Sequence, residues 1–398
     1  MRRSSFRFVW ILASVLVTMI ASSPVRAQQE GGEDSATPGW RYEFQRKYEL
    51  FRDYGHDWRL AALFGLNPEE GLLIGGGPIL YEFGFRSFPF VYRMQLTGEI
   101  AIPQGRYRFA YSLFMPALSD GLSLELLAHA SELEVTNFYG FGNTSPRDEA
   151  KENEDFYRVA SREFLIHPTL YRELSQRSYL GLGIAYKNFR VRRKENRFYN
   201  QLSLDSLGDK RSQLGAGIGL RIDTRDYERA PHSGVYLDIE GWSFVDPAGT
   251  SPPFQRIKGE GRIYFGDTLF TDVMVAFRAG GERVFGTFPF HESAFLGGGS
   301  SLRGFLAQRF AGDASVFGNV ELRIALFRSK MIVPTEVGVF VLGDAGRVWV
   351  DGTSAGRWHS DAGGGLWLAP LNRDLLASLL VASSVDGLFF RAALGFEF

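Results

Sequence analysis

The stretch that decides the fold is FLGGGSSLRGFLAQRFAGDASVFGNVELRIALF, residues 295–327. A glycine-rich segment with Arg303 at its centre leads directly into a strongly alternating strand. One face of that strand carries Val320, Leu322, Ile324 and Leu326, and the other carries Asn319, Glu321, Arg323 and Ala325. Because successive side chains of a strand point to opposite faces, one face is apolar and the other polar. This pattern predicts the wall of a barrel with lipid outside and a polar lumen inside.

The same alternation recurs along the chain to its last residue. Clear examples are residues 90–100, 107–115, 122–129, 180–187, 213–223, 256–263 and 388–398. A soluble sandwich with polar outer faces is the alternative. It fits less well, because so many Arg, Lys and Glu side chains interleaved in strands of about ten residues suit a wet lumen. Counting back from Phe398 gives about sixteen strands, with the first at Trp58–Leu66.

The sequence therefore predicts an all-β fold, a transmembrane antiparallel β-barrel over residues 58–398. With both ends in the periplasm, the linkers divide by length, as in bacterial barrels. Short periplasmic turns are expected at Ser87–Pro89, Ala117–Asp120 and Gly266–Thr268. Long extracellular loops are expected at Glu134–Glu154, Arg192–Arg211, Phe285–Ser315 and Ala345–His359.

Composition supports this class and excludes others. The 398 residues are 15% aromatic, include 46 Gly and no Cys, and carry a formal net charge of −1. The mean hydropathy of −0.11 excludes a bundle of transmembrane helices, which would show repeated apolar runs of about 20 residues. The near-zero charge gives no global basic footprint for nucleic acid. The lack of Cys removes disulfides, Cys metal sites and a lipid-modified N-terminal cysteine.

The first 27 residues have the pattern of a secretory signal peptide. A positive region ending at Arg7 precedes the only continuous apolar run, Phe8–Ile20, and small residues at Val25 and Ala27 precede a plausible cleavage site. An uncleaved anchor helix is the alternative. Residues 28–57 are then a short periplasmic N-terminal segment, in which Trp40–Tyr54 fits either an amphipathic helix under the barrel or a tail.

Three motifs in order, LGGGSSLRGF (296–305), GNVELRIALF (318–327) and VLGDAGRVW (341–349), resemble the C-terminal barrel of the BamA/TamA-like bacterial surface antigen superfamily. Two upstream segments are also similar to that family: RIDTRDYERAPHSGVYLDIEG (221–241) and NFYGFGN (137–143). The resemblance implies an outer-membrane barrel that inserts or translocates proteins, or lipids, at the bacterial outer membrane.

The resemblance also implies a site. In the family, the sixth outer loop folds back into the lumen, and the arginine of an arginine-glycine-aromatic motif pairs with acids on the wall. Here that motif is Arg303-Gly304-Phe305, and the motif acids fall on Glu321 and Asp344. The strand phase places Glu321 on the polar face, as such a pair requires.

The chain departs from the family in one respect. Typical members carry periplasmic domains that hand over substrates, whereas this chain is expected to have only residues 28–57 there. Substrate delivery would then use a separate periplasmic partner or the membrane itself. The expected partners are outer-membrane lipids and lipopolysaccharide and an unfolded substrate protein, with no nucleic acid, and the barrel is expected to be a monomer.

The first and last strands of a barrel meet at a seam, here between Trp58–Leu66 and Leu388–Phe398. If the seam opens sideways, its edge strands can template an incoming strand. Gly395 either weakens this lateral seam or is an ordinary small residue facing the lumen.

Two other function classes remain open. One is a passive pore or lipid-transport barrel without insertase activity. The other is a barrel enzyme, which needs a nucleophile with a base in reach. Its nearest candidates, His232-Ser233 and His291-Glu292-Ser293, lie in turn or loop contexts, and no zinc-type His spacing appears. The sequence therefore predicts no catalytic residues, no metal and no cofactor.

Overall fold

The computed structural model describes residues 54–67, 71–85, 87–201, 210–227, 230–268, 271–329, 333–371 and 376–398. The expected signal peptide at residues 1–27, and residues 28–53 of the expected periplasmic segment, lie outside this range. The first strand begins at Gly55, three residues before the expected start at Trp58.

Within the described residues, sixteen strands form one antiparallel sheet in chain order, which confirms the predicted all-β fold and strand number. The strands are β1 Gly55–Asn67, β2 Gly71–Gly84, β3 Ser87–Pro103, β4 Tyr107–Ser119, β5 Leu122–Asn137, β6 Arg158–Ser175, β7 Ser178–Val191, β8 Lys210–Asp223, β9 Gly234–Val245, β10 Phe254–Thr268, β11 Asp272–Gly286, β14 Ala314–Ser329, β15 Thr335–Trp349, β16 His359–Pro370, β17 Ala377–Ser384 and β18 Gly387–Leu394. A separate two-stranded sheet pairs β12 Ala294–Leu296 with β13 Phe310–Gly312.

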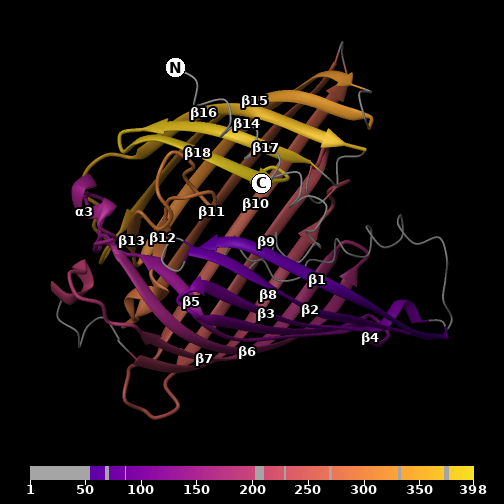
Figure 1. Cartoon of the computed structure of the whole chain (residues 1–398), viewed down its shortest axis with the longest axis horizontal. Helices are drawn as coiled ribbons and strands as arrows, with labels where there is room; N and C mark the ends of the chain where they lie inside the picture. The colour runs from indigo at the N-terminus through magenta and orange to yellow at the C-terminus, as the bar shows by residue number, and fades with distance from the viewer. Residues whose placement is uncertain are drawn as a thin grey trace.

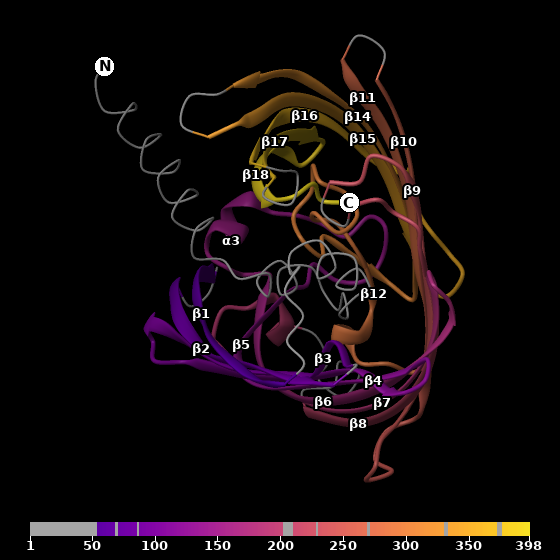
Figure 2. The ribbon, with the colours of Figure 1, turned by 90° about the vertical axis from the view of Figure 1, so that its right-hand side faces the viewer.

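The large sheet curls into an open ring in which β1 and β18 are not paired with each other, and the loop between β11 and β14 lies inside it (Figures 1 and 2). Since each strand runs antiparallel to the next, alternate linkers meet at the same end. The long ones, 138–157, 192–209, 287–313 and 350–358, share the end expected to be extracellular. At the other end most turns are short, but the linker of residues 224–233 is longer than 350–358. The segments expected as short turns fall in strands instead: Ser87–Pro89 belongs to β3, Ala117–Ser119 to β4 and Gly266–Thr268 to β10.

Burial follows the predicted alternation. On β7, Leu182 and Ile184 are 55% and 57% exposed, while their neighbour Ala185 is buried. On β14, Glu321 and Arg323 are buried on the inner face. The apolar side chains thus face outward, where a membrane would cover them, and charged side chains fill the interior. No helix in the described part of the chain is long and apolar enough to cross a membrane.

The outer loops pack together through an aromatic cluster. The loop after β5 carries α3 Glu149–Asn153, and the loop after β7 carries the short 3-10 helix η2 Phe198–Gln201. Phe138 and Phe290, both fully buried, come from two different loops and lie with ring centroids 5.1 Å apart. Ala311 forms isolated bridges to Phe141 and Gly142. The expected extracellular end of the ring is therefore occupied by packed loops.

The last strand differs from its prediction. The alternation predicted a strand through Phe398 with Phe396 and Phe398 facing lipid, but β18 ends at Leu394. Gly395 has φ +95°, a backbone conformation that glycine adopts without strain, and its N–H donates to the Leu376 carbonyl at 2.7 Å. The final residues consequently turn inward, and Phe398 is only 4% exposed.

Candidate functional site

The loop of residues 287–313 builds the candidate site inside the ring. A 3-10 helix, η3 Phe290–Glu292, and the β12–β13 ladder give it a defined path. Gly297 has φ +116°, and a Cβ there would lie 2.4 Å from the Leu306 carbonyl oxygen. Only glycine permits this close turn, which presents the following arginine to the wall.

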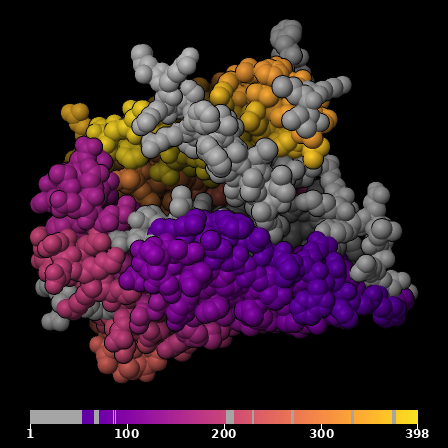
Figure 3. All heavy atoms as spheres, viewed as in Figure 1, coloured from indigo at the N-terminus to yellow at the C-terminus, as the bar shows by residue number. Residues whose placement is uncertain are grey.

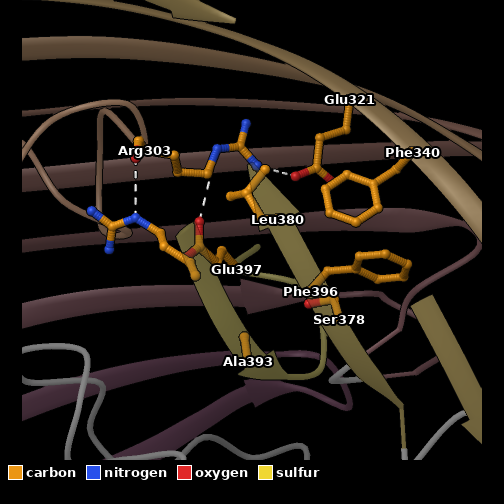
Figure 4. A pocket seen from close by; sticks show the side chains of 9 residues that line it. Arg303, Glu321, Phe340, Ser378, Leu380, Ala393, Phe396 and Glu397 are labelled. Carbon is orange, nitrogen blue, oxygen red and sulfur yellow. Dashed lines mark hydrogen bonds and ion pairs between the residues drawn. The ribbon is translucent and has the colours of Figure 1, made fainter. Parts of the chain in front are cut away.

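Arg303 is held between two strands of the wall. Its Nε and Nη2 donate to the two carboxylate oxygens of Asp344 on β15 at 2.8 and 2.5 Å. Its backbone N–H donates to Asp344 Oδ2 at 3.0 Å, and its Nη1 donates to Glu321 on β14. The structure thus brings together the three charged residues that the sequence singled out. Figure 4 shows two of them, Arg303 and Glu321.

The cluster of Arg303, Glu321 and Asp344 is deeply buried, and the opposite charges of its members stabilise it. Arg303 and Glu321 are each 1% exposed, and Asp344 is 4% exposed. Burial alone would lower the pKa of Arg303, but hydrogen bonds to Asp344 and the charge of Glu321 raise it above its ordinary value. A planar guanidinium meets a carboxylate with two parallel bonds, which fixes direction as well as adding energy. Removing one partner of such a buried pair costs about 3–5 kcal/mol.

The next two residues of the motif have distinct packing roles. A Cβ on Gly304 would lie 2.5 Å from the Cβ of Asp361 on β16, so the loop approaches the wall as closely as glycine allows. The Phe305 ring is fully buried and makes an edge contact with Phe310, with ring centroids 5.6 Å apart. The charge of Arg303, the close contact at Gly304 and the buried ring of Phe305 together hold the loop against the wall.

The β17–β18 hairpin forms hydrogen bonds with the backbone of this loop. Arg391 on β18 donates from Nε to the Arg303 carbonyl at 3.0 Å and from Nη2 to the Phe305 carbonyl at 2.8 Å. Arg309 Nε donates to Asp386 Oδ2, in the β17–β18 turn, at 2.7 Å. The C-terminal side of the seam is therefore bonded to the loop that the Arg303 pair holds in place.

A second anchor ties the loop to the opposite wall. Glu292 of η3 is 1% exposed and forms ion pairs with Lys187 Nζ on β7 at 3.1 Å and Arg256 Nη2 on β10 at 3.2 Å. Burial alone would raise the pKa of Glu292, but these two cations lower it to about 2. The neighbouring His291 ring stacks on Phe189 at 3.6 Å, and burial lowers its pKa to about 3.

Sequence reasoning considered Glu292 only as part of a catalytic cluster and missed this anchoring contact. The available signal was an acidic residue inside an otherwise apolar loop segment, FPFHESAF, residues 288–295. Its partners on β7 and β10 are far away in the sequence, so no local pattern could pair them.

The predicted seam residues lie at two sheet edges. β1 contains both Trp58 and Leu66. Among the described strands, β1 pairs only with β2, and β18 pairs only with β17. Trp58 is 61% exposed. Figure 3 shows the indigo surface of the first strands and the yellow surface of the last strands on opposite sides of one face.

The expected outward Phe398 is instead on the inner wall, which corrects the prediction for the end of the seam. Its ring packs with Tyr264 and Met274, and its carbonyl oxygen accepts a hydrogen bond from Arg323 Nη2 at 2.6 Å. Phe396 lies under the Arg323 guanidinium, 3.7 Å from it. Aromatic packing and these cations draw the tail inward once Gly395 has turned the chain.

The histidine clusters weighed as catalytic candidates have other contacts. His232 Nε2 lies 2.9 Å from Asp272 Oδ1, while the Ser233 hydroxyl donates to Asp226. The Ser293 hydroxyl donates to the Phe290 carbonyl at 2.6 Å. In the described ranges, no group of three His, Cys, Asp or Glu side chains has a metal-binding arrangement.

Fold and site together define an outer-membrane β-barrel with an arginine-pinned loop in its lumen. The Omp85 superfamily domain matches residues 93–370, more than half of the chain, so the protein belongs to the Omp85 superfamily, as the motif resemblance implied. A comparison with curated proteins found no match.

Two solved structures are similar to the chain. One is BamA from Haemophilus ducreyi lacking POTRA domains 1–3, with 17% identity, a TM-score of 0.60, and coverage of 86% of this chain and 70% of that one. The other is CdiB from Escherichia coli, with 13% identity, a TM-score of 0.55, and coverage of 87% and 62%. At these identities the likeness shows the fold, and the chain spans less than two thirds of CdiB.

Proposed function

We propose that this protein inserts or translocates proteins at the bacterial outer membrane through a lateral seam between β1 and β18. The observation that carries the proposal is the pair of unmatched edges in the described sheet. Every neighbouring pair from β1 to β18 is joined by a ladder, while β1 and β18 are not joined to each other. Such edges present unpaired N–H and C=O groups that an incoming strand can use.

The two edges are not equivalent. β18 spans 8 residues and is gripped from inside by the docked loop through Arg391 and Asp386. β1 spans 13 residues, all of them in the ladder with β2. We propose that β1, with its longer row of backbone groups, is the edge that receives a substrate strand, while β18 is the fixed side.

The packed lumen supports this function over the passive pore or lipid-transport alternative. The loop of residues 287–313 lies inside the ring, and its two anchors, Arg303 and Glu292, reach different parts of the wall. An open conduit would need this loop to leave. The alternative therefore predicts large conductance from the wild-type protein in a planar bilayer, whereas our proposal predicts small conductance.

We also propose a location, an oligomeric state and partners for this protein. We place it in the bacterial outer membrane as a monomer with outer-membrane lipids and lipopolysaccharide around it, an unfolded protein as substrate, and a separate periplasmic protein as the delivery partner. Nothing in this mechanism requires a catalytic residue, a cofactor or nucleic acid, and we propose that the protein is not an enzyme.

A disulfide across the seam tests the proposal. The chain has no cysteine, so an engineered pair is the only thiol pair present. Ala61 on β1 and Ala393 on β18 are small and lie on inner-facing positions, where replacement disturbs the lipid face least. We would combine Ala61→Cys or Leu63→Cys with Phe389→Cys or Ala393→Cys and keep the pair that forms a bridge.

The locked protein should lose assembly or export activity in cells and regain it on reduction. The matched control is a disulfide between β3 and β4 at Thr97 and Ala110, which are register partners within a formed ladder. Activity retained in the locked seam variant would refute the lateral seam and favour the pore. Equal loss in the control would show that any crosslink disturbs the protein.

A further inference from the structure

Three cations form an outward-facing row on neighbouring strands β6, β7 and β8. Arg162 and Arg190 are cross-strand Cα partners, and Arg190 and Lys210 are partners on the next pair. The three strands lie side by side in the wall (Figure 2). Since neighbouring strands are about 4.8 Å apart, three positive side chains share one short band.

Burial places this row on the lipid-facing side. Arg190 is exposed, while its neighbours Phe189 and Val191 are buried on the inner face. Further along the same outer face of β7 come Tyr186 and Ile184. The row therefore continues the membrane face rather than the lumen.

The row sits at the end of the strands next to the long outer loops. β7 ends at Val191, one residue beyond Arg190, and β8 begins at Lys210. From Arg190 to Tyr186 the chain covers four residues, about 13 Å along the strand. The cations thus lie above the apolar band, at the height where the headgroups of the outer leaflet would meet the barrel.

Like charges placed directly opposite each other in a sheet destabilise it, so the row needs a counter-charge. Glu132 on β5 supplies one, with its Oε1 2.8 Å from Arg162 Nε. Among the residues that the structure describes, Glu132 is the only acid that forms an ion pair with any of these three cations.

We propose that Arg190 and Lys210, with Arg162 beside them, bind the phosphate groups of lipopolysaccharide in the outer leaflet. An arginine fork and a lysine ammonium suit phosphate oxygens, while the apolar face below suits the acyl chains of the same lipid. Charge complementarity and the height of the row above the apolar band favour this occupant. The inference rests on the outer-membrane location and orientation proposed above.

The test measures binding of purified lipopolysaccharide to the detergent-solubilised protein. Arg190→Gln combined with Lys210→Gln should weaken binding about 30-fold at low salt, because each cation at a charged lipid surface contributes a factor of about five. The matched control is Arg172→Gln. Arg172 is exposed on the same face of β6 but ten residues away, near the periplasmic end, where its Nη1 donates to the Asp120 carbonyl.

Lipopolysaccharide from which the lipid A phosphates have been removed should bind wild-type protein as weakly as intact lipid binds the double variant. Vesicles of phosphatidylglycerol distinguish the other source of phosphate. Unchanged binding in the double variant, an equal loss in Arg172→Gln, or equal residue-dependent binding of phosphatidylglycerol would each overturn the proposal. A heat-dependent gel shift checks that each variant is folded, and cell fractionation tests the location separately.

Discussion

Replacing Arg303 with Ala should loosen the docked loop without dissolving the barrel. The change removes three side-chain bonds, two of them to Asp344, which keeps the backbone N–H of residue 303 and its contact with Asp361. Glu321 keeps Arg323, whose Nε lies 2.5 Å from Glu321 Oε2, so Asp344 bears most of the loss. Breaking a buried pair costs about 3–5 kcal/mol, which raises the local opening equilibrium about 10²- to 10³-fold or somewhat more.

The loop should nevertheless stay near the wall, because other anchors persist. Glu292 keeps its ion pairs, and Phe305 keeps its apolar cluster. The sheet ladders do not involve the Arg303 side chain, so the protein should still show a heat-dependent gel shift.

The absence of native cysteine allows a direct assay of opening. In a Ser301→Cys background the thiol is buried, and its maleimide labelling reports opening, while exposed Ser300→Cys serves as the matched control. Arg303→Ala should accelerate labelling at position 301 by about 10²-fold or more and leave position 300 unchanged. Arg303→Lys should fall between, because an ammonium keeps the charge and loses the fork. Equal labelling of wild type and Arg303→Ala at position 301 would refute the pin.

Three further predictions follow from the same contacts. Glu292→Gln should raise conductance in planar bilayers, because it releases the second anchor of the loop. The control Glu336→Gln, at the other end of the wall, should leave conductance unchanged. Unchanged conductance in Glu292→Gln would show that Glu292 does not hold the loop in the lumen. Because the pKa of His291 falls from about 6.5 unfolded to about 3 in the docked loop, the docked state binds fewer protons, and its stability should decrease as pH falls from about 6.5 towards 3. Hydrogen exchange of residues 287–296, corrected for intrinsic rates, should therefore quicken at pH 5 in wild type and much less in His291→Phe. Finally, boiled and unboiled protein from the membrane fraction should migrate differently on a gel, and identical migration with the protein in the soluble fraction would contradict the barrel.

The strands themselves were predictable, because their signal is local. A period of two is written in consecutive residues, so β14 and its neighbours could be found with their faces correctly assigned, Glu321 inward and Val320 outward. The longest linkers were likewise predicted at one end, whereas the expected turns Ser87–Pro89 and Gly266–Thr268 lie inside strands. Arg303, Glu321 and Asp344 came from motif resemblance rather than from periodicity, and the geometry places them in contact.

The inward path of the last four residues could not be predicted from the local sequence. The alternation of Leu394, Phe396 and Phe398 fits a continued outward strand, yet a single positive φ at Gly395 turns the tail onto Arg323 and Phe340 inside the ring. No pattern in four residues reveals which wall they will meet, since that wall is built from strands more than fifty residues away.

The register between neighbouring strands determined which distant side chains meet. Glu292 met Lys187 and Arg256, and Arg162, Arg190 and Lys210 aligned in one row, because each strand settled against its neighbour at one offset. The sequence by itself determined which side chains face lipid and which face the lumen, through the twofold repeat of each strand. Which side chains stand at the same height, and whether the first strand meets the last, depended on the summed register of the whole sheet and on the loop inside it, which only the tertiary structure supplies.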